Sequence, residues 1–372
     1  MPRLRSIMFV FCAMLALAVP AHARTASPTP PIGHVFVVML ENENADVTFG
    51  PGSPAPYLSQ TLPSQGAFVP GYYGVTHLSL GNYVAFVSGQ GSNPQTQADC
   101  EVYNDFVGAG FDANGQALGQ GCVYPTSVKT VADQLAARGL TWKGYMEDMG
   151  NDPSRESATC GHPALNSQDG TQNATATDQY AARHNPFVYF HSIIDTPSCA
   201  ANDVPLTRLP ADLAKPKSTA NFSFITPNLC HDGHDTGCKN GEPGGLVSAD
   251  AWLRQWVPQI TGSAAFKRDG LLLITFDEAE ASDTSADASA CCNEAQFPNT
   301  PNNGGPIPGR GGGRVGAVAL SPFIRPGTVS SVPYNHFSTL RTIEGLFGLP
   351  FLGYANTPDP GSFGRDVFSG SF

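Results

Sequence analysis

Basic residues are scarce in this sequence of 372 residues, which has 20 lysines and arginines against 31 aspartates and glutamates. The formal net charge is -11, and only 14% of the residues are charged. A protein that binds along a nucleic acid backbone needs clustered lysine and arginine to displace counterions. The acidic balance therefore argues against nucleic acid as a partner. The hydrophobic content of 41% also excludes an intrinsically disordered chain.

Apolar runs long enough to span a membrane are also missing. The apolar run at residues 7–19 follows Arg3 and Arg5 and precedes Ala21-His22-Ala23, a pattern typical of a signal peptide cleaved after residue 23. This run is shorter than the roughly 20 apolar residues that cross a bilayer. We therefore expect residues 1–23 to direct export and to leave no stable membrane anchor. The expected location is secreted or periplasmic, with residues 24–372 forming one domain.

The cysteines lack the CxxC spacing of a zinc knuckle. The sequence has nine cysteines, and removal of the signal peptide with Cys12 would leave eight. An even number in an exported chain indicates disulfide bonds. Sequence order suggests the pairs Cys100–Cys122, Cys160–Cys199 and Cys230–Cys238, with Cys291 and Cys292 joined to each other or each bonded elsewhere.

Apolar segments alternate with helical patterns, and no repeat is visible. Strands are predicted at residues 34–40, 222–226, 270–276 and 315–321, and helices at residues 79–88, 130–138, 250–261 and 338–347. Continuously apolar strands are typical of a parallel sheet with helices on both faces, so the fold class is α/β. Stretches rich in glycine, proline, asparagine and serine, near 89–125, 150–178 and 281–313, are expected to be disulfide-tied surface insertions.

Acidic and amide side chains follow two of the predicted strands. Glu41 and Asn42 come directly after residues 34–40, and Asp277 and Glu278 come directly after residues 270–276. The carboxyl ends of parallel strands meet at one edge of a sheet. Clustered carboxylates repel one another unless a cation lies among them. One such motif alone more often begins a solvated loop, but two together favour a metal site.

Ser79 stands where the helix at residues 79–88 is predicted to begin. Its hydroxyl would lie at the positive end of the helix dipole, where an anion or an alkoxide is favoured. Asn82, three residues later, shares its face and can donate a hydrogen bond to an oxyanion. His77 flanks the same segment. The alternative is that Ser79 is an ordinary N-cap residue.

Two histidines and two aspartates follow residues 222–226, namely His231, Asp232, His234 and Asp235. Imidazole and carboxylate groups at this density suit metal binding or general acid–base catalysis. A polar turn with incidental histidines is the alternative. His336 precedes the last predicted helix and either reaches the same edge or only flanks the helix.

Several of these motifs occur together in one known family. They are residues 34–42, His77 with Ser79 and Asn82, residues 226–230 with Asp232 and His234, residues 275–278, residues 313–322 and residues 336–344. In this order they resemble the bacterial phosphoesterase family, which contains secreted acid phosphatases and phospholipases C and lies within the alkaline phosphatase superfamily. The resemblance implies a three-layer sandwich around a mostly parallel central sheet.

The resemblance also implies roles for individual residues. It implies that Glu41, Asn42, Asp277 and Glu278 hold a metal ion beside the nucleophile Ser79, that His234 or His336 carries protons, and that His77, Asn82, His184 and Asp232 face the substrate. The region of Asp232, His234 and His336 forms a second metal site in some superfamily members and would otherwise contact phosphate, and both options stay open. His231 has no clear counterpart.

The reaction implied is hydrolysis of a phosphate monoester through a phosphoseryl intermediate. Oxygen ligands with optional histidine suit zinc, manganese, calcium or iron, so the divalent or trivalent metal is not identified. A phospholipase C-type phosphodiesterase would share the same first step. A secreted protein that binds a metal or phosphate without turnover is the non-enzymatic alternative.

Overall fold

The structure is a computed structural model that describes residues 29–282, 285–359 and 361–371. The expected signal peptide, residues 1–23, lies outside the described residues. Within the described ranges, no helix combines the length and the apolar character needed to cross a membrane.

A sheet of eight strands organises the described chain, in the order β13-β2-β12-β11-β1-β10-β7-β9. Its strands are β1 (His34–Leu40), β2 (Ala67–Val69), β7 (Trp142–Met146), β9 (Asp203–Pro205), β10 (Phe222–Thr226), β11 (Gly270–Phe276), β12 (Ala317–Leu320) and β13 (Thr328–Val329). Strands β11, β1, β10, β7 and β9 run parallel to one another, whereas β12 is antiparallel to both β11 and β2. The sheet is therefore mostly parallel, as predicted.

The three strands at the centre of the sheet are completely buried. Every residue of β1, β10 and β11 is buried, which requires cover on both faces. The predicted bounds of these strands agree with the structure. The prediction for residues 315–321 was too long, because β12 pairs with β11 only from Ala317 to Leu320.

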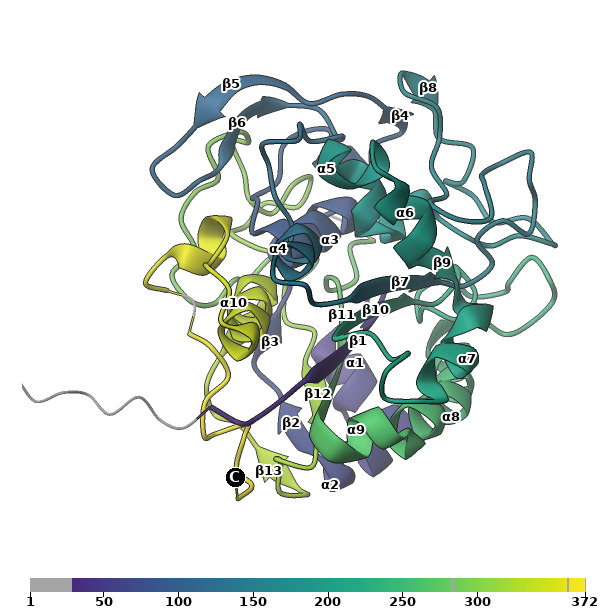
Figure 1. The fold of residues 1–372 in the computed structure, drawn as a ribbon, viewed down its shortest axis with the longest axis vertical. Coiled ribbons are helices and arrows are strands. Elements are labelled where there is room, and N and C mark those ends of the chain that lie inside the picture. Colours follow the sequence, from purple (N-terminus) through teal and green to yellow (C-terminus); the bar gives the residue numbers. More distant parts are fainter. Residues whose placement is uncertain (1–28, 283–284, 360, 372) are drawn as a thin grey trace, which may run out of the picture.

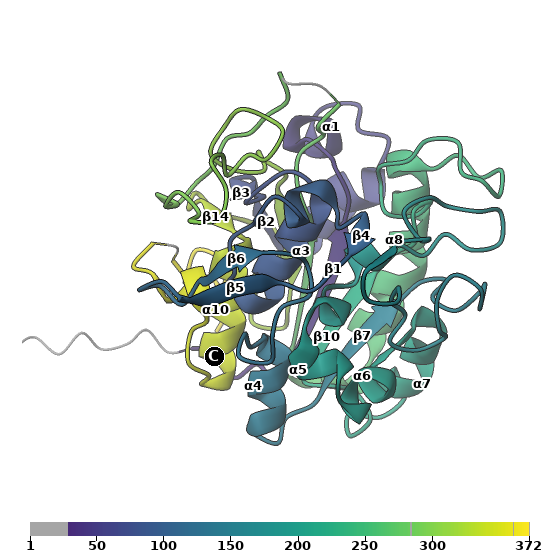
Figure 2. The same cartoon turned by 90° about the horizontal axis from the view of Figure 1, so that it is seen from above.

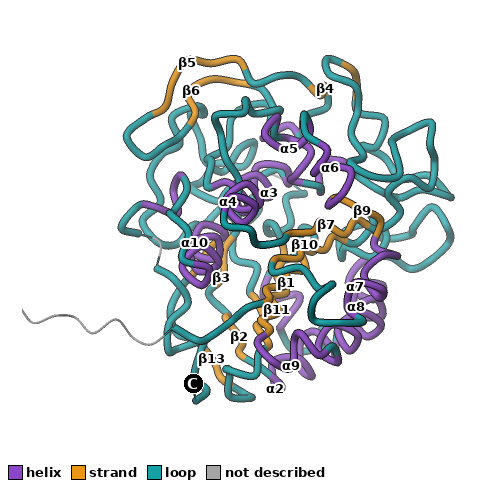
Figure 3. Tube along the Cα trace, in the orientation of Figure 1, coloured by secondary structure: helices purple, strands orange, loops and turns teal. Residues whose placement is uncertain are grey.

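Helices cover both faces of the sheet and complete the three layers (Figure 1). One face carries α3 (Ser79–Ser88), α4 (Val131–Ala137) and α10 (His336–Phe347), which contact one another. The opposite face carries α7 (Leu209–Leu213), α8 (Gly245–Gly262) and α9 (Ala264–Asp269). Figure 2 gives the same arrangement from above, and Figure 3 shows how much of the chain between these elements is loop.

Shorter elements fill the connections. The short helices are α1 (Ala45–Phe49), α2 (Leu62–Gln65), α5 (His191–Ile194) and α6 (Pro197–Asn202), with single turns at Tyr57–Thr61, Thr96–Ala98, Ala182–His184, Pro186–Tyr189, Leu206–Arg208 and Gly353–Asn356. Small two-stranded pairs are formed by β3 (Tyr72–Tyr73) with β14 (Tyr334–Asn335), β4 (Val102–Tyr103) with β8 (Ser167–Gln168), and β5 (Val107–Phe111) with β6 (Ala117–Gln120).

Capping groups explain where the predicted helices begin. The prediction for α3 agrees with the structure, and α4 begins after Thr130, which forms a capping box with Asp133. Helix α10 begins at His336 rather than residue 338, because Asn335 caps it and accepts from the Ser338 N–H. The start predicted for α8 at residue 250 was wrong. Asp250 lies inside that helix and accepts from the Leu58 N–H at 2.9 Å.

All of the suggested disulfide pairs are present: Cys100–Cys122, Cys160–Cys199, Cys230–Cys238 and Cys291–Cys292. Three of them cross-link loop-rich stretches that were expected to be insertions. The hairpin of β5 and β6 belongs to one such stretch and lies at the periphery of the molecule (Figure 1). These bonds reduce the freedom of long loops that the sheet alone would not fix.

Candidate active site

The candidate site begins where β1 and β11 end side by side. Leu40 and Phe276 are partners in the parallel register, so Glu41 and Asp277 leave the sheet at the same edge. The Asn42 N–H donates to Asp277 Oδ1 at 3.0 Å, and Asn42 adopts a left-handed backbone with φ of 49°. This turn keeps Glu41, Asn42 and Asp277 together.

Ser79 faces this corner from the first turn of α3. Its hydroxyl donates to Glu41 Oε2 at 2.8 Å. The alternative role of N-cap is excluded, because Leu78 occupies that position. The Leu80 N–H is satisfied by Asp99 Oδ1 at 2.9 Å instead. The Ser79 hydroxyl is thus directed at the Glu41 carboxylate rather than at its own helix.

Glu41 is ionised although it is buried. The Tyr83 hydroxyl donates to Glu41 Oε1 at 2.6 Å, and His184 Nε2 lies 3.2 Å from Glu41 Oε2. Burial raises the pKa of Glu41, but the charge and hydrogen bond of His184 and the hydrogen bond of Tyr83 lower it to about 2. The His184 ring stacks on the Tyr83 ring at 5.3 Å, which fixes both partners.

The other carboxyl groups shift in the opposite direction. Burial, followed by the charge of Glu41, raises the pKa of Asp277 well above its ordinary value. Burial and the charge of Asp277 do the same for Glu278. Asp232 is raised to a pKa of about 8 by burial and then by the charge of Glu41. The charges of these carboxyl groups raise one another's pKa, so a cation among them would relieve the repulsion.

Three buried oxygen atoms at this corner have no hydrogen-bond partner among the described residues. They are Asn42 Oδ1, Asp277 Oδ2 and Glu278 Oε1. Buried polar atoms without a partner are costly and rare in folded proteins. Amide and carboxylate oxygens are suitable ligands for hard and borderline cations. The donor set of Asn42, Asp277 and Glu278, together with Glu41, therefore fits a metal ion.

A second group of ligand-type atoms does not form a comparable centre. Ligand atoms of Cys230, His231 and Glu242 lie within 4.8 Å of one another. Cys230 is bonded to Cys238, so it offers no thiolate. His231 lies between two carboxylates, with Nδ1 3.0 Å from Glu147 and Nε2 2.9 Å from Glu242.

His77 and Asn82 support the segment before Ser79. His77 Nδ1 lies 2.9 Å from Glu278 Oε2, and its Nε2 is 3.1 Å from the Asp287 carbonyl oxygen. Asn82 Oδ1 accepts from the Val75 N–H at 2.8 Å, while its Nδ2 donates to the Thr76 carbonyl at 2.9 Å. Their polar atoms already have protein partners. The role expected for Asn82, donation to an oxyanion, does not match this geometry, because its amide secures the turn that presents Ser79.

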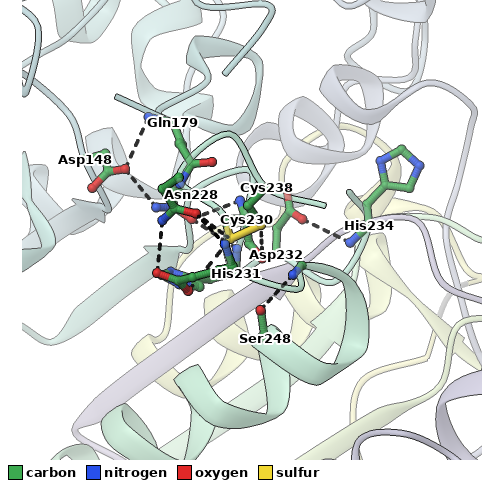
Figure 4. The surroundings of a disulfide bond; sticks show 12 residues. Asp148, Gln179, Asn228, Cys230, His231, Asp232, His234, Cys238 and Ser248 are labelled. Carbon is green, nitrogen blue, oxygen red and sulfur yellow. Dashed lines mark hydrogen bonds and ion pairs between the residues drawn. A yellow bond between two sulfur atoms is a disulfide. The ribbon is translucent and has the colours of Figure 1, made fainter. Parts of the chain in front are cut away.

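Asp232 and His234 lie on the loop that the Cys230–Cys238 disulfide closes (Figure 4). The Asp232 carbonyl accepts from the Glu41 N–H at 2.8 Å, and its carboxylate accepts from the His234 N–H at 3.0 Å. The His234 ring is 39% exposed and lies near Asp235 and Glu280. Its hydrogen bond with Asp235 outweighs burial and raises its pKa to about 9. His234 is therefore a protonated, accessible imidazole beside the site.

His336 lies behind Asp277 and is completely buried. Its Nε2 contacts the Asp277 carbonyl oxygen, and its Nδ1 lies 3.2 Å from the Tyr72 hydroxyl. Burial lowers the pKa of His336 to about 4, although the contact with the Asp277 carbonyl opposes this. A neutral imidazole held from both sides suits positioning of Asp277, and this geometry favours His234 over His336 as the proton carrier.

Sequence reasoning missed Tyr83 and Asp99. Tyr83 is four residues after Ser79 in the same helix, so the helical period places it on the same face, and this signal could have found it. Asp99 reaches the start of α3 from a loop stretch, and nothing in the local sequence indicates that contact.

Comparison with known proteins gives a consistent result. The family model described as "Phosphoesterase family" matches residues 54–350. An acid phosphatase of Aspergillus fumigatus is 26% identical over 344 residues, which cover 90% of this chain and 61% of that protein. A phosphatidylinositol-3-phosphatase of Mycobacterium tuberculosis is 26% identical over 343 residues, which cover 92% of this chain and 86% of that protein. The chain thus spans about three fifths of the fungal relative.

Solved structures resemble the fold at low sequence identity. A structure from Bacteroides thetaiotaomicron, described with the metabolism of multiple glycosaminoglycans, has a TM-score of 0.51 at 12% identity and covers 91% of this chain and 82% of its own. A protein in the alkaline phosphatase superfamily from Vibrio parahaemolyticus has a TM-score of 0.48 at 13% identity, with 91% and 72% covered. The first of these supports the three-layer α/β architecture.

Proposed function

Because the chain belongs to the Phosphoesterase family, a family of hydrolases acting on phosphoester bonds, we propose that it hydrolyses phosphate monoesters through a phosphoseryl intermediate on Ser79. The observation that carries this proposal is the Ser79 hydroxyl, which donates to Glu41 Oε2 at 2.8 Å, a carboxylate whose pKa is lowered to about 2. A serine hydroxyl is a weak nucleophile until a neighbouring group accepts its proton or lowers its pKa.

In the proposed reaction, Ser79 Oγ attacks phosphorus while its proton moves toward Glu41 Oε2. The bond between phosphorus and the leaving alcohol breaks, and the phosphoryl group stays on Ser79. Tyr83 and His184 keep Glu41 in place and ionised at the start of this step. Water then cleaves the phosphoserine and releases inorganic phosphate. Preorganised charges of this kind account for most of the rate enhancement in phosphoryl transfer.

The three unpartnered oxygens support a metal ion as the cofactor. Asn42, Asp277 and Glu278 would hold it through these oxygens, together with Glu41. A bound cation of this kind supplies positive charge that lowers the pKa of a nearby hydroxyl and offsets the charge of the phosphate. Zinc, manganese, calcium and iron all accept such ligands.

His234 is the proposed proton donor to the leaving alcohol. Its raised pKa of about 9 keeps it protonated at neutral pH, and its exposed ring leaves room for a substrate. Asp232 joins the His234 backbone to the Glu41 backbone and thereby sets the distance between the acid and the nucleophile. His336 holds Asp277 from behind.

The relatives favour monoesters over diesters, because the ones reported above are an acid phosphatase and a phosphatidylinositol-3-phosphatase. A disulfide framework of four bonds supports an oxidising location, which is the secreted or periplasmic space. We also propose that residues 24–372 form one catalytic domain with insertions near 89–125, 150–178 and 281–313.

The test is phosphate release by the purified protein from a soluble monoester, a soluble diester and a phospholipid, before and after chelation and with metal add-back. We expect monoester turnover that chelation abolishes and one metal restores. Preference for the diester or the lipid would replace the proposal with a phospholipase C-type phosphodiesterase. No phosphate release from any of the three substrates, together with retained metal binding, would indicate a binding protein without turnover.

A further inference from the structure

Arg183 places a positive charge beside the candidate site, and the mechanism above does not use it. It belongs to the turn Ala182–His184, directly before the histidine that contacts Glu41. Its side chain is only 15% exposed. A long cationic side chain in such a position loses conformational freedom and hydration, so its retention calls for a specific interaction.

Two groups fix the guanidinium from one side. Its Nη1 donates to the Gln172 carbonyl at 2.9 Å, and its Nε lies 3.7 Å from Asp99 Oδ2. The other oxygen of Asp99 accepts from the Leu80 N–H, next to the nucleophile. One carboxylate therefore ties Arg183 to the first turn of α3. No hydrogen bond to Nη2 is present among the described residues.

Two of the other carboxylates that act on the guanidinium, those of Glu41 and Asp232, belong to the site. Burial lowers the pKa of Arg183, but the surrounding carboxylates raise it by more. In order of effect these belong to Asp99, Glu41, Asp232 and Asp169. Arg183 also contributes to the lowered pKa of Asp235, after His234. The charges of Glu41 and Asp232 thus reach the guanidinium, and His184, the next residue, lies 3.2 Å from Glu41 Oε2.

A phosphate group that binds beside Ser79 needs positive charge near its oxygens. A monoester carries up to two negative charges, and it must approach Ser79 past the ionised Glu41. A cation held by Asn42, Asp277 and Glu278 would offset charge on one side of the phosphoryl group only. A guanidinium recognises phosphate through paired N–H donors, with higher geometric specificity than an ammonium.

We propose that Arg183 is a further catalytic residue that donates from Nη2 to a non-bridging oxygen of the substrate phosphoryl group, with Asp99 as its positioning residue. This assignment rests on the proposed phosphoesterase function. It makes a phosphoryl group with two free non-bridging oxygens the preferred ligand, because one oxygen can face Arg183 while another faces the carboxylate corner.

Arg155 offers a matched comparison inside the same molecule. Its guanidinium is also buried, with 9% of the side chain exposed, and it lies 3.4 Å from Asp178 Oδ1. Its Nη1 donates to the Asp178 carbonyl at 2.6 Å, and its Nη2 donates to the Asn173 carbonyl at 2.9 Å. Every terminal nitrogen of Arg155 thus has a protein acceptor. Arg155 is a structural arginine, and its substitution controls for the loss of a buried guanidinium.

The experiment compares Arg183→Ala and Arg183→Lys with Arg155→Lys in the full chain. We measure kcat and KM for a soluble monoester and the affinity for inorganic phosphate by calorimetry. We expect both Arg183 variants to lose about 100-fold or more in kcat/KM and to bind phosphate at least about tenfold more weakly. Millimolar guanidinium should restore part of the activity of Arg183→Ala. Arg155→Lys should lose stability but keep its KM and its phosphate affinity.

Unchanged KM and phosphate affinity in Arg183→Lys would overturn the assignment. The assignment would also fail if the activity lost in Arg183→Ala is no larger than the fraction of protein that fails to fold. If Arg183→Ala does not fold, Arg183→Lys decides. If the wild type releases no phosphate from any ester, the proposed function fails separately. Phosphate affinity that falls in Arg183→Lys but not in Arg155→Lys would then still support an anion contact at Arg183. A wild type that does not bind phosphate would overturn it.

Discussion

Two clusters of acidic residues lie beyond the carboxyl ends of neighbouring parallel strands. The central cluster of Glu41, Asp277 and Ser79 follows β1 and β11 and meets the start of α3. The lateral cluster of Glu147, His231 and Glu242 follows β7 and β10. Because both clusters hold similar residue types at the same edge of one sheet, either could have served as the metal site.

The clusters differ in how their charges are matched. In the lateral cluster, both ring nitrogens of His231 face a carboxylate, and hydrogen bonds to Glu147 and Glu242 outweigh burial and raise the pKa of His231 to about 9. In the central cluster, buried oxygens of Asn42 and Asp277 have no partner among the described residues. A satisfied cluster stabilises the fold, whereas an unsatisfied one is prepared for a ligand.

The largest expected effect comes from Ser79→Ala in the central cluster. Activity should fall by about 10³- to 10⁶-fold, because no other hydroxyl replaces the nucleophile. The control is Ser263→Ala, since Ser263 caps α9 through the Phe266 N–H. That variant should lose about 1 kcal/mol of stability and keep its activity. Turnover by Ser79→Ala at the wild-type rate would rule out the nucleophile assignment.

Asp277→Asn tests the difference between the clusters directly. An amide is a weaker metal ligand than a carboxylate, so bound metal and activity should both fall, with activity reduced at least about 100-fold. Metal content is measured by mass spectrometry of the purified protein. Glu242→Gln in the lateral cluster should retain the metal. Equal metal loss in both variants would contradict the comparison.

His234→Gln should reduce the rate by about 100-fold, because the leaving alcohol loses its proton donor. The raised pKa of His234 means that the protonated form dominates below about pH 9. Wild-type activity that depends on this proton is therefore present at lower pH and declines as the pH rises through about 9. The variant should lack this decline in a rate-against-pH profile. A decline of the same size in His234→Gln would assign it to another group.

The smallest effect is expected from His231→Gln, and it concerns stability. The folded pKa of about 9 lies above the ordinary value of 6.5, so the protonated imidazole stabilises the fold. This contribution is complete below about pH 6.5 and is lost as the pH rises through about 9. Solvent screening limits it to about 1–2 kcal/mol. Chemical unfolding at several pH values should show this loss in the wild type only, with kcat unchanged in His231→Gln.

The strands were predictable because each is a local apolar run in the sequence. The disulfides were predictable because neighbouring cysteines in the sequence pair with each other. Strands β1, β10 and β11 are short apolar runs with clear ends, and their bounds agree with the prediction. Pairing neighbouring cysteines in sequence order gave three of the bonds, and the fourth, Cys291–Cys292, was one of two options. The start of α8 was missed, since Asp250 looks like a cap in sequence but accepts a hydrogen bond from a distant backbone.

The candidate site was predictable as a set of residues but not as a network. The sequence indicated that Glu41, Asp277 and Ser79 belong together, and the structure brings them together. It did not indicate that Asn82 holds the preceding turn or that His336 lies behind Asp277. These details depend on the direction of each side chain, which residue type and spacing do not specify.

The amino-acid sequence alone determined the α/β class, three of the disulfide pairs and the family, because apolar periodicity, cysteine order and motif order are properties of the linear chain. Tertiary structure decided which charged groups are satisfied. His231 and His234 are three positions apart and each faces two carboxylates. The His231 contacts of 3.0 and 2.9 Å leave its side chain 20% exposed, whereas the His234 contacts of 3.3 and 3.5 Å leave its side chain 39% exposed. The reason is physical: the partners of His231 come from positions distant in sequence, and only folding brings them within hydrogen-bond distance.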